Sequence, residues 1–171
     1  MTRTETDSTS ELIGLATQGS WRIVNDDVMG GRSDSNFAVA DGRAVFEGNL
    51  SPDNGGGFAS VRADLSAAPS PDTVAVVIRV RGDGKRYQFR VRTSEQRDGP
   101  AYKYEFSTTK GEWTTVRLPL AEFELSFRGR LIPDAPVIDA GRIRQVGFLI
   151  ADRQWGRFRL EVESIRVEGG S

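Results

Sequence analysis

Apolar and polar residues alternate with a period of two along most of the chain from Trp21 onward. The clearest run is Thr73–Arg81, in which every even-numbered residue from Val74 to Val80 is apolar. Successive side chains of a strand point to opposite faces, so this alternation predicts a strand with one buried face.

The same period recurs in further segments, which Gly, Asn, Asp and Pro residues separate. No segment shows a sustained helical period. Many strands without helices to support parallel crossovers predict an all-β fold, an antiparallel β-sandwich of the jelly-roll type. The expected strands are Phe37–Val39, Ala44–Gly48, Phe58–Leu65, Arg86–Arg92, Ala101–Phe106, Glu112–Leu118, Arg142–Ile150 and Arg157–Val167.

Two local signals refine this picture. The parity of the apolar positions shifts between Val162 and Ile165, which predicts a bulge near Glu163 and Ser164. The turn Gly82-Asp83-Gly84 separates two alternating runs, and Asp-Gly in such a place predicts a β-hairpin.

The ends of the chain are less patterned. Residues 1–10 are polar and rich in Thr and Ser, so we expect a loose tail there and a single domain over residues 11–171. Residues 11–17 fit one helical turn or a short edge strand, and the pattern does not decide between these.

The chain contains neither Cys nor His. These absences exclude disulfides, zinc fingers, iron–sulfur clusters and Ser-His-Asp triads. Acid–base chemistry at neutral pH would depend on a perturbed Glu, Asp or Lys, and no recognised carboxylate pair stands out, so we expect no enzyme activity and no cofactor. Only oxygen ligands could hold a metal, which would favour calcium or magnesium.

The 171 residues include 23 basic and 24 acidic ones, a net charge of −1. This balance provides no long-range field for nucleic acid or an anionic membrane. No segment approaches the ~20 apolar residues of a membrane span, and the first ten residues lack the apolar stretch of a secretory signal. We therefore expect a cytoplasmic protein that binds no nucleic acid and does not cross a membrane.

Several glycine-rich and aromatic segments interrupt the strands. None has the spacing of a phosphate-binding loop or a dinucleotide-binding turn. Taken in order from Trp21 to Val167, they resemble the NADH:ubiquinone oxidoreductase (complex I) intermediate-associated protein 30 family, in the form of a bare bacterial-type member. The matching segments are Trp21–Ser33, Phe46–Gly48, Asn54–Arg62, Gly82–Tyr87, Trp113–Pro119, Phe127–Gly129, Gly147–Asp152 and Gly156–Ile165.

The resemblance implies a galactose-binding-like β-sandwich, in agreement with the strand pattern. It also implies a non-catalytic module that binds a protein partner and assists assembly of a larger complex, with respiratory complex I as the candidate, because mitochondrial members are assembly chaperones for complex I. The alternative function is a carbohydrate-binding module with a glycan ligand.

The loop that contains Asn25, Asp26 and Asp27 is the first candidate site. Its oxygens could bind calcium, with Asp152 joining them, or they could hydrogen-bond to the local backbone of a turn. We favour the interpretation without metal. Arg32 and Arg62 each follow a glycine-rich turn, where an arginine could bind a carboxylate or phosphate in bidentate fashion or pin a loop through an internal ion pair.

A set of long polar side chains forms the second candidate. If their strands are neighbours, they share one sheet face, which is either a docking face for a glycan, an anion or a protein, or a solvated face with cross-strand ion pairs. Trp155 is the best candidate for an exposed glycan platform, whereas Trp21 and Trp113 are expected in the core. The polar set is Arg79, Arg81, Gln88, Arg90, Arg92, Lys103, Glu105, Arg157, Arg159 and Glu161.

Overall fold

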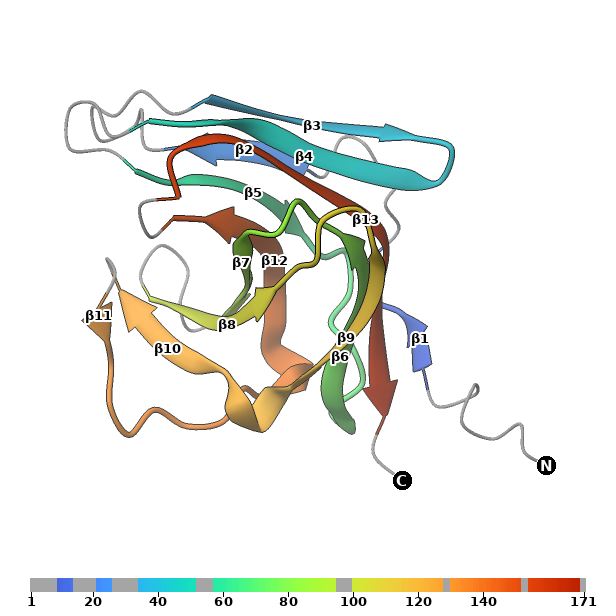
Figure 1. Ribbon diagram of the computed structural model, residues 1–171. Helices are drawn as coiled ribbons and strands as arrows, with labels where there is room; N and C mark the ends of the chain where they lie inside the picture. Colours follow the sequence, from blue (N-terminus) through green and yellow to red (C-terminus); the bar gives the residue numbers. More distant parts are fainter. Residues whose placement is uncertain are drawn as a thin grey trace.

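Two antiparallel sheets pack face to face, as the alternation predicts (Figure 1). The computed structural model describes residues 9–13, 21–25, 34–51, 57–94, 100–127, 130–151 and 154–169. Within these ranges the helical elements are the short 3-10 turns Leu120–Glu122 and Ala140–Arg142. None of the described helices has the length and apolar character needed to cross a membrane. The all-β sandwich prediction is confirmed.

Sheet A has the strand order β3-β4-β13-β6-β9, and β1 also pairs with β13. The last of these strands in the sequence, β13, therefore lies at the centre of the sheet. The bounds are β1 Thr9–Glu11, β3 Asp34–Ala40, β4 Arg43–Leu50, β6 Thr73–Arg81, β9 Trp113–Pro119 and β13 Gly156–Gly169.

Sheet B has the order β11-β10-β8-β7-β12-β5-β2. Its long central strands, β7 and β12, run antiparallel with Phe89 opposite Phe148. The bounds are β2 Trp21–Asn25, β5 Ala59–Asp64, β7 Arg86–Thr93, β8 Ala101–Ser107, β10 Glu124–Phe127, β11 Arg130–Leu131 and β12 Ile143–Ile150.

The core lies between the inner faces of the two sheets. Phe46 and Phe158 of sheet A meet edge to face at 5.1 Å, and Phe89 and Phe148 of sheet B do so at 5.3 Å. These rings are fully or almost fully buried. Truncating one buried Phe typically costs about 3–5 kcal/mol, so this layer is where most of the stability resides.

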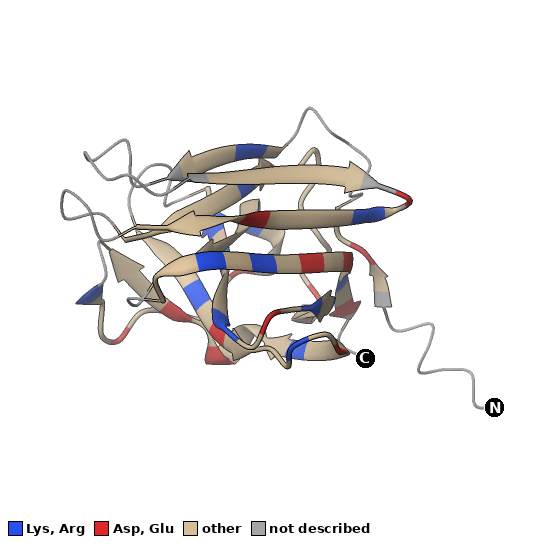
Figure 2. Cartoon of the chain, turned by 45° about the horizontal axis from the view of Figure 1, so that its top comes forward, with Lys and Arg blue, Asp and Glu red and all other residues tan. Residues whose placement is uncertain are grey.

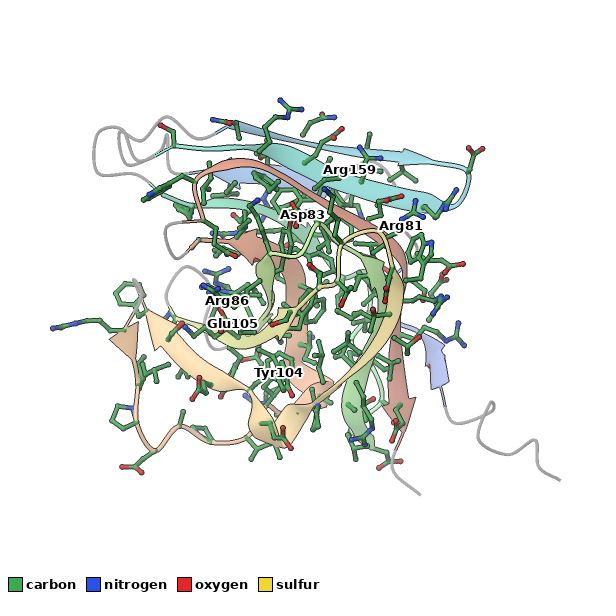
Figure 3. All side chains as sticks on the ribbon, viewed as in Figure 1. Arg81, Asp83, Arg86, Tyr104, Glu105 and Arg159 are labelled. Carbon is green, nitrogen blue, oxygen red and sulfur yellow. The ribbon has the colours of Figure 1, made fainter. Side chains whose placement is uncertain are left out.

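The hairpin predicted at Gly82-Asp83-Gly84 is wrong. The strand before the turn, β6, belongs to sheet A, and the strand after it, β7, belongs to sheet B. The Asp83 carboxylate accepts from the Tyr87 hydroxyl at 3.0 Å. It also accepts from the backbone N–H of Arg159 at 2.8 Å, and Figure 3 labels both of these residues. These bonds hold the connection across the edge of the sandwich, so the chain changes sheets instead of reversing within one.

Thr108 fixes the same connection from the other side. Its hydroxyl donates to the Lys85 carbonyl at 2.7 Å and accepts from the Gly84 N–H at 3.1 Å. A Cβ on Gly82 would lie 2.2 Å from the Thr108 Cβ, so only glycine fits at position 82. The segment Gly82–Tyr87 is therefore explained by the fold alone.

The structure confirms the predicted bulge but differs from the predicted loose tail. The bulge is confirmed, because the register of β13 on β6 shifts between Val162 and Ser164. Thr9 and Ser10, assigned to the loose tail, pair with Glu168 and Val167 of β13. Of the two alternatives for residues 11–17, Glu11 lies in a short edge strand, and residues 14–17 are outside the described ranges.

Candidate binding surface

The single polar face predicted from the sequence is wrong, because the crossover after β6 divides its members between two opposite surfaces. One group lies on the outer face of sheet A: Arg79, Arg81, Arg157, Arg159 and Glu161. The other lies on the outer face of sheet B: Gln88, Arg90, Arg92, Lys103 and Glu105.

On sheet A, arginines meet glutamates of neighbouring strands, and basic and acidic segments occur together on β4 and β13 (Figure 2). Arg81 binds Glu161 through two bonds of 2.7 and 2.9 Å, and Arg117 binds Glu168 through two of 2.8 Å. Arg79 bonds to Glu163 at 2.9 Å, and Arg159 bonds to Glu47 at 2.8 Å. The hydrogen bonds from Arg81 lower the pKa of Glu161, because they favour its charged form.

Trp113 also lies on this outer face, half-buried, so the expectation that it is a core residue is wrong. The register of β9 places it opposite Arg81, whose guanidinium carbon lies 4.9 Å from the ring centroid. The guanidinium carbons of Arg43 and Arg79 lie at 5.7 and 5.8 Å. Cation–π attraction thus joins the tryptophan to the paired arginines.

Sheet B carries a different arrangement at its centre. Arg22, Arg62, Arg90 and Lys103 occupy the same register position on β2, β5, β7 and β8, and Gly147 of β12 fills the place between Arg62 and Arg90. We call these four cations the cation row. Tyr87, Phe89 and Val91 of β7 are buried in the core, so Arg90 points outward by alternation.

A small hollow of about 20 Å³ lies over Gly147, and the polar side chains that line it are those of Ser60, Arg62, Arg90, Arg92 and Gln145. Arg90 donates to the Gln88 amide oxygen at 2.7 Å, and Arg92 donates to that of Gln145 at 3.1 Å. Burial, and secondarily the nearby charge of Arg62, lower the pKa of Arg90 to about 10. Among the described residues, the hydrogen-bond partner of Arg90 is thus a neutral amide. On sheet A, by contrast, the partners of the arginines are carboxylates.

Gly147 is essential to this geometry. A Cβ at this position would lie 2.2 Å from the Val61 carbonyl oxygen on β5. The backbone of β12 can therefore approach β5 only with glycine here, and the missing side chain leaves the hollow open between the arginines of the adjoining strands.

The described carboxylates of this face do not line the hollow, although Asp64 bonds to Gln145, which does. Asp64 accepts from Arg22 at 3.2 Å and from Gln145 at 3.0 Å, and the Gln145 bond is the first cause of the lowered pKa of Asp64. Glu105 lies 3.5 Å from Arg86, side by side in Figure 3. The centre of the face is thus basic and its margins are mixed.

Trp155 is exposed, with 41% of its surface accessible, as the sequence predicts. Gln154 fixes its position, because the amide of Gln154 bonds to both the N–H and the carbonyl of Arg86 at 2.8 Å. The indole lies against Gly57, where a Cβ would come within 3.1 Å of the ring. The structure thus presents an exposed aromatic ring next to a residue that is bonded to the start of β7.

The candidate residues predicted from the sequence do not form one site. Arg62 and Arg90 come together at the hollow, whereas Arg79 and Arg81 lie on the opposite side of the sandwich. Asn25 ends β2. Gln145 and Gly147 were missed, since only the cross-strand register of β12 reveals their place. Asp26, Asp27, Arg32 and Asp152 lie outside the described residues, as does any calcium site built on them.

The two antiparallel sheets define a β-sandwich of the jelly-roll type with a galactose-binding-like fold. Residues 10–162 match the family described as Complex I intermediate-associated protein 30, and the chain belongs to this family. It is 26% identical over 168 residues to the mitochondrial Complex I intermediate-associated protein 30 of Mus musculus, covering 86% of this chain and 51% of the mouse protein. The chain therefore spans about half the length of that relative.

A further relative, from Schizosaccharomyces pombe, has the name Uncharacterized protein C9E9.15 and is 28% identical over 168 residues, with 86% of this chain and 77% of the relative covered. Among solved structures, a family 11 carbohydrate-binding module of Clostridium thermocellum in complex with a β-1,3-1,4-mixed-linked tetrasaccharide superposes with a TM-score of 0.71. It shares 14% identity, with 95% of this chain and 96% of that module covered, so the likeness concerns the fold.

Proposed function

We propose that this chain is a non-catalytic protein-binding module that assists assembly of a larger complex, with respiratory complex I as the first candidate. The observation that carries the proposal is the family match over residues 10–162. Relatives in mouse and in Drosophila melanogaster bear the name Complex I intermediate-associated protein 30. The cytoplasm is the compartment we propose, and fractionation of the host cell tests it.

The electrostatics of the described residues favour binding over catalysis. A general acid that works at neutral pH needs a carboxyl group with a raised pKa. The pKa values of Asp64, Glu161 and Glu168 are instead lowered, in each case first by a hydrogen bond from a neighbouring side chain. The chain also contains neither His nor Cys.

Sheet B is the better docking face for a protein. On sheet A, Arg81 and Arg117 already bind glutamates in bidentate fashion, each through Nε and one terminal nitrogen. On sheet B, the hydrogen bond described for Arg90 goes to a neutral amide, so its charge remains available to a partner.

Site-directed cross-linking tests this proposal, because the absence of Cys lets a single introduced thiol report one face. Glu105→Cys on sheet B and Thr115→Cys on sheet A are both exposed and form a matched pair. With a photo-cross-linker on the thiol in host cells, we expect Glu105→Cys to capture subunits of complex I assembly intermediates and Thr115→Cys to capture few. Capture of complex I subunits by neither variant, or equally by both, would contradict the proposal.

A carbohydrate-binding role is the second candidate, and the exposed ring of Trp155 is the observation that favours it. Aromatic rings presented in this way can stack on sugars or anchor proteins. Titration with a mixed-linked β-glucan tetrasaccharide, followed by tryptophan fluorescence, decides the matter. A Kd below about 1 mM that Trp155→Ala removes would support this function.

A further inference from the structure

The hollow over Gly147 suits a single small polar group. Its volume, about 20 Å³, is near the minimum of ~10–15 Å³ for holding one water molecule. One carboxylate oxygen is of this size, whereas a sugar ring with its hydroxyl groups is several times larger. The geometry therefore selects the tip of a side chain rather than a ring.

The chemistry around the hollow selects an anion. Arg62, Arg90 and Arg92 all line it, together with the amide of Gln145. Burial lowers the pKa of Arg90 to about 10, which means that the folded chain disfavours this positive charge. A bound carboxylate would offset that cost through charge-assisted hydrogen bonds, which are stronger than the bond from Arg90 to Gln88.

The cation row sets the length of the ligand. It crosses from β2 through β5, β12 and β7 to β8, and neighbouring strands are about 4.8 Å apart, so the row extends about 19 Å. An extended peptide advances about 3.3 Å per residue, so about six residues cover the row. Every second side chain of such a peptide points to the same face, which lets alternating acidic residues meet the cations on both sides of Gly147.

We infer that the cation row binds an extended acidic peptide segment of a partner protein, with one Asp or Glu carboxylate seated over Gly147 against Arg90. The inference rests on the proposed function in taking the partner to be a protein. The paired arginines of sheet A offer no equivalent, since Glu161 and Glu168 already bind Arg81 and Arg117. In the cation row, Arg22 binds Asp64, but it lies at the end of the row, apart from Arg90.

The test uses the isotope-labelled full chain and a capped six-residue peptide with glutamate at every second position. We expect the Nε–Hε NMR signals of Arg90 and Arg92 to shift saturably, with a Kd at or below about 1 mM at low ionic strength. The same peptide with glutamine in place of glutamate should leave them unchanged. Arg90→Gln should weaken peptide binding at least about tenfold, whereas the matched control Arg117→Gln on sheet A should change it less than about twofold.

Three results would overturn the inference. The first is no saturable shift up to about 10 mM peptide. The second is equal weakening by Arg90→Gln and Arg117→Gln, which would indicate a general charge effect. The third is binding of inorganic phosphate or of the mixed-linked tetrasaccharide at Arg90 as tight as that of the peptide. If the peptide binds but the cross-linker captures no complex I subunits, this site stands and the proposed function is contradicted. If subunits are captured but the peptide does not bind, only this site is contradicted.

Discussion

The two outer faces of the sandwich carry similar numbers of long basic side chains but use them differently. On sheet A, Arg81 and Arg117 each bind one glutamate through two hydrogen bonds. On sheet B, Arg90 and Arg92 donate to the amides of Gln88 and Gln145 around a hollow. The difference teaches that an arginine-rich strand is not by itself a binding surface: what matters is whether the neighbouring strands supply carboxylates.

The largest expected effect comes from removing the ring that joins the arginines of sheet A. Because Trp113 is half-buried and contacts the guanidinium groups of neighbouring arginines, Trp113→Ala should lower the free energy of unfolding by about 2 kcal/mol. Trp113→Phe should cost less, since a smaller ring still faces Arg81. Urea denaturation measures both, and the acidic peptide should bind each variant as it binds the parent chain.

Replacing Arg90 should change the free energy of unfolding in the opposite direction. Since burial disfavours its charge, Arg90→Gln should raise the free energy of unfolding by about 1 kcal/mol. Arg117→Gln should instead lower stability slightly, because it leaves Glu168 without its bidentate partner. Urea midpoints of the two variants provide the comparison. A loss of stability in Arg90→Gln as large as that of a core truncation would mean that Arg90 holds the fold together.

Acid should weaken sheet A through its carboxylates. Hydrogen bonds from Arg81 and Arg117 lower the pKa values of Glu161 and Glu168 in the folded chain. Their contribution is therefore present above the unfolded pKa, near 4.5, and is lost as the pH falls through that value to the lower folded pKa. Melting curves from pH 7 down to about pH 3 should show a smaller acid-induced fall in Tm for Glu168→Gln than for the parent. An identical fall would mean that solvent screens this pair completely.

The smallest effect is expected at Trp155. Its ring is exposed, so Trp155→Ala should change the free energy of unfolding by less than about 0.5–1 kcal/mol. Binding of the acidic peptide should remain within about twofold of the parent value, because the ring lies outside the residues that line the hollow. Thermal melting and the same NMR titration measure the two quantities.

Alternation was enough to predict most of the strands, the bulge at Val162–Ser164 and the sandwich, but not the short strands β10 and β11. It failed where the question was which strands are neighbours, because pairing is decided by contacts distant in sequence. Asp-Gly illustrates the limit. Asp41-Gly42 has positive φ at both residues, 56° and 77°, and closes the β3–β4 hairpin, whereas Asp83-Gly84 connects two sheets.

The candidate site was predictable only in part, for the same reason. Arg62 and Arg90 could be singled out as polar residues after a glycine turn or on a strand face. Their convergence on Gly147 depends on the register of β5, β12 and β7, which no local pattern contains. The outward position of Trp113 could have been predicted from the sequence. Trp113 and Arg117 are both odd-numbered residues of β9, whereas the even-numbered Val116 and Leu118 point inward.

The central place of β13 in sheet A has a consequence for the order in which the protein forms. All the strands of sheet B lie within residues 21–150, so that sheet can pair before β13 leaves the ribosome. Sheet A cannot, because β3–β4, β6–β9 and β1 are joined to one another only through residues 156–169. Closure of the sandwich thus waits for contacts of very long sequence separation, the kind that makes folding slow. A nascent chain that pauses before β13 exposes the inner face of sheet B and is, for that interval, a client for chaperones itself.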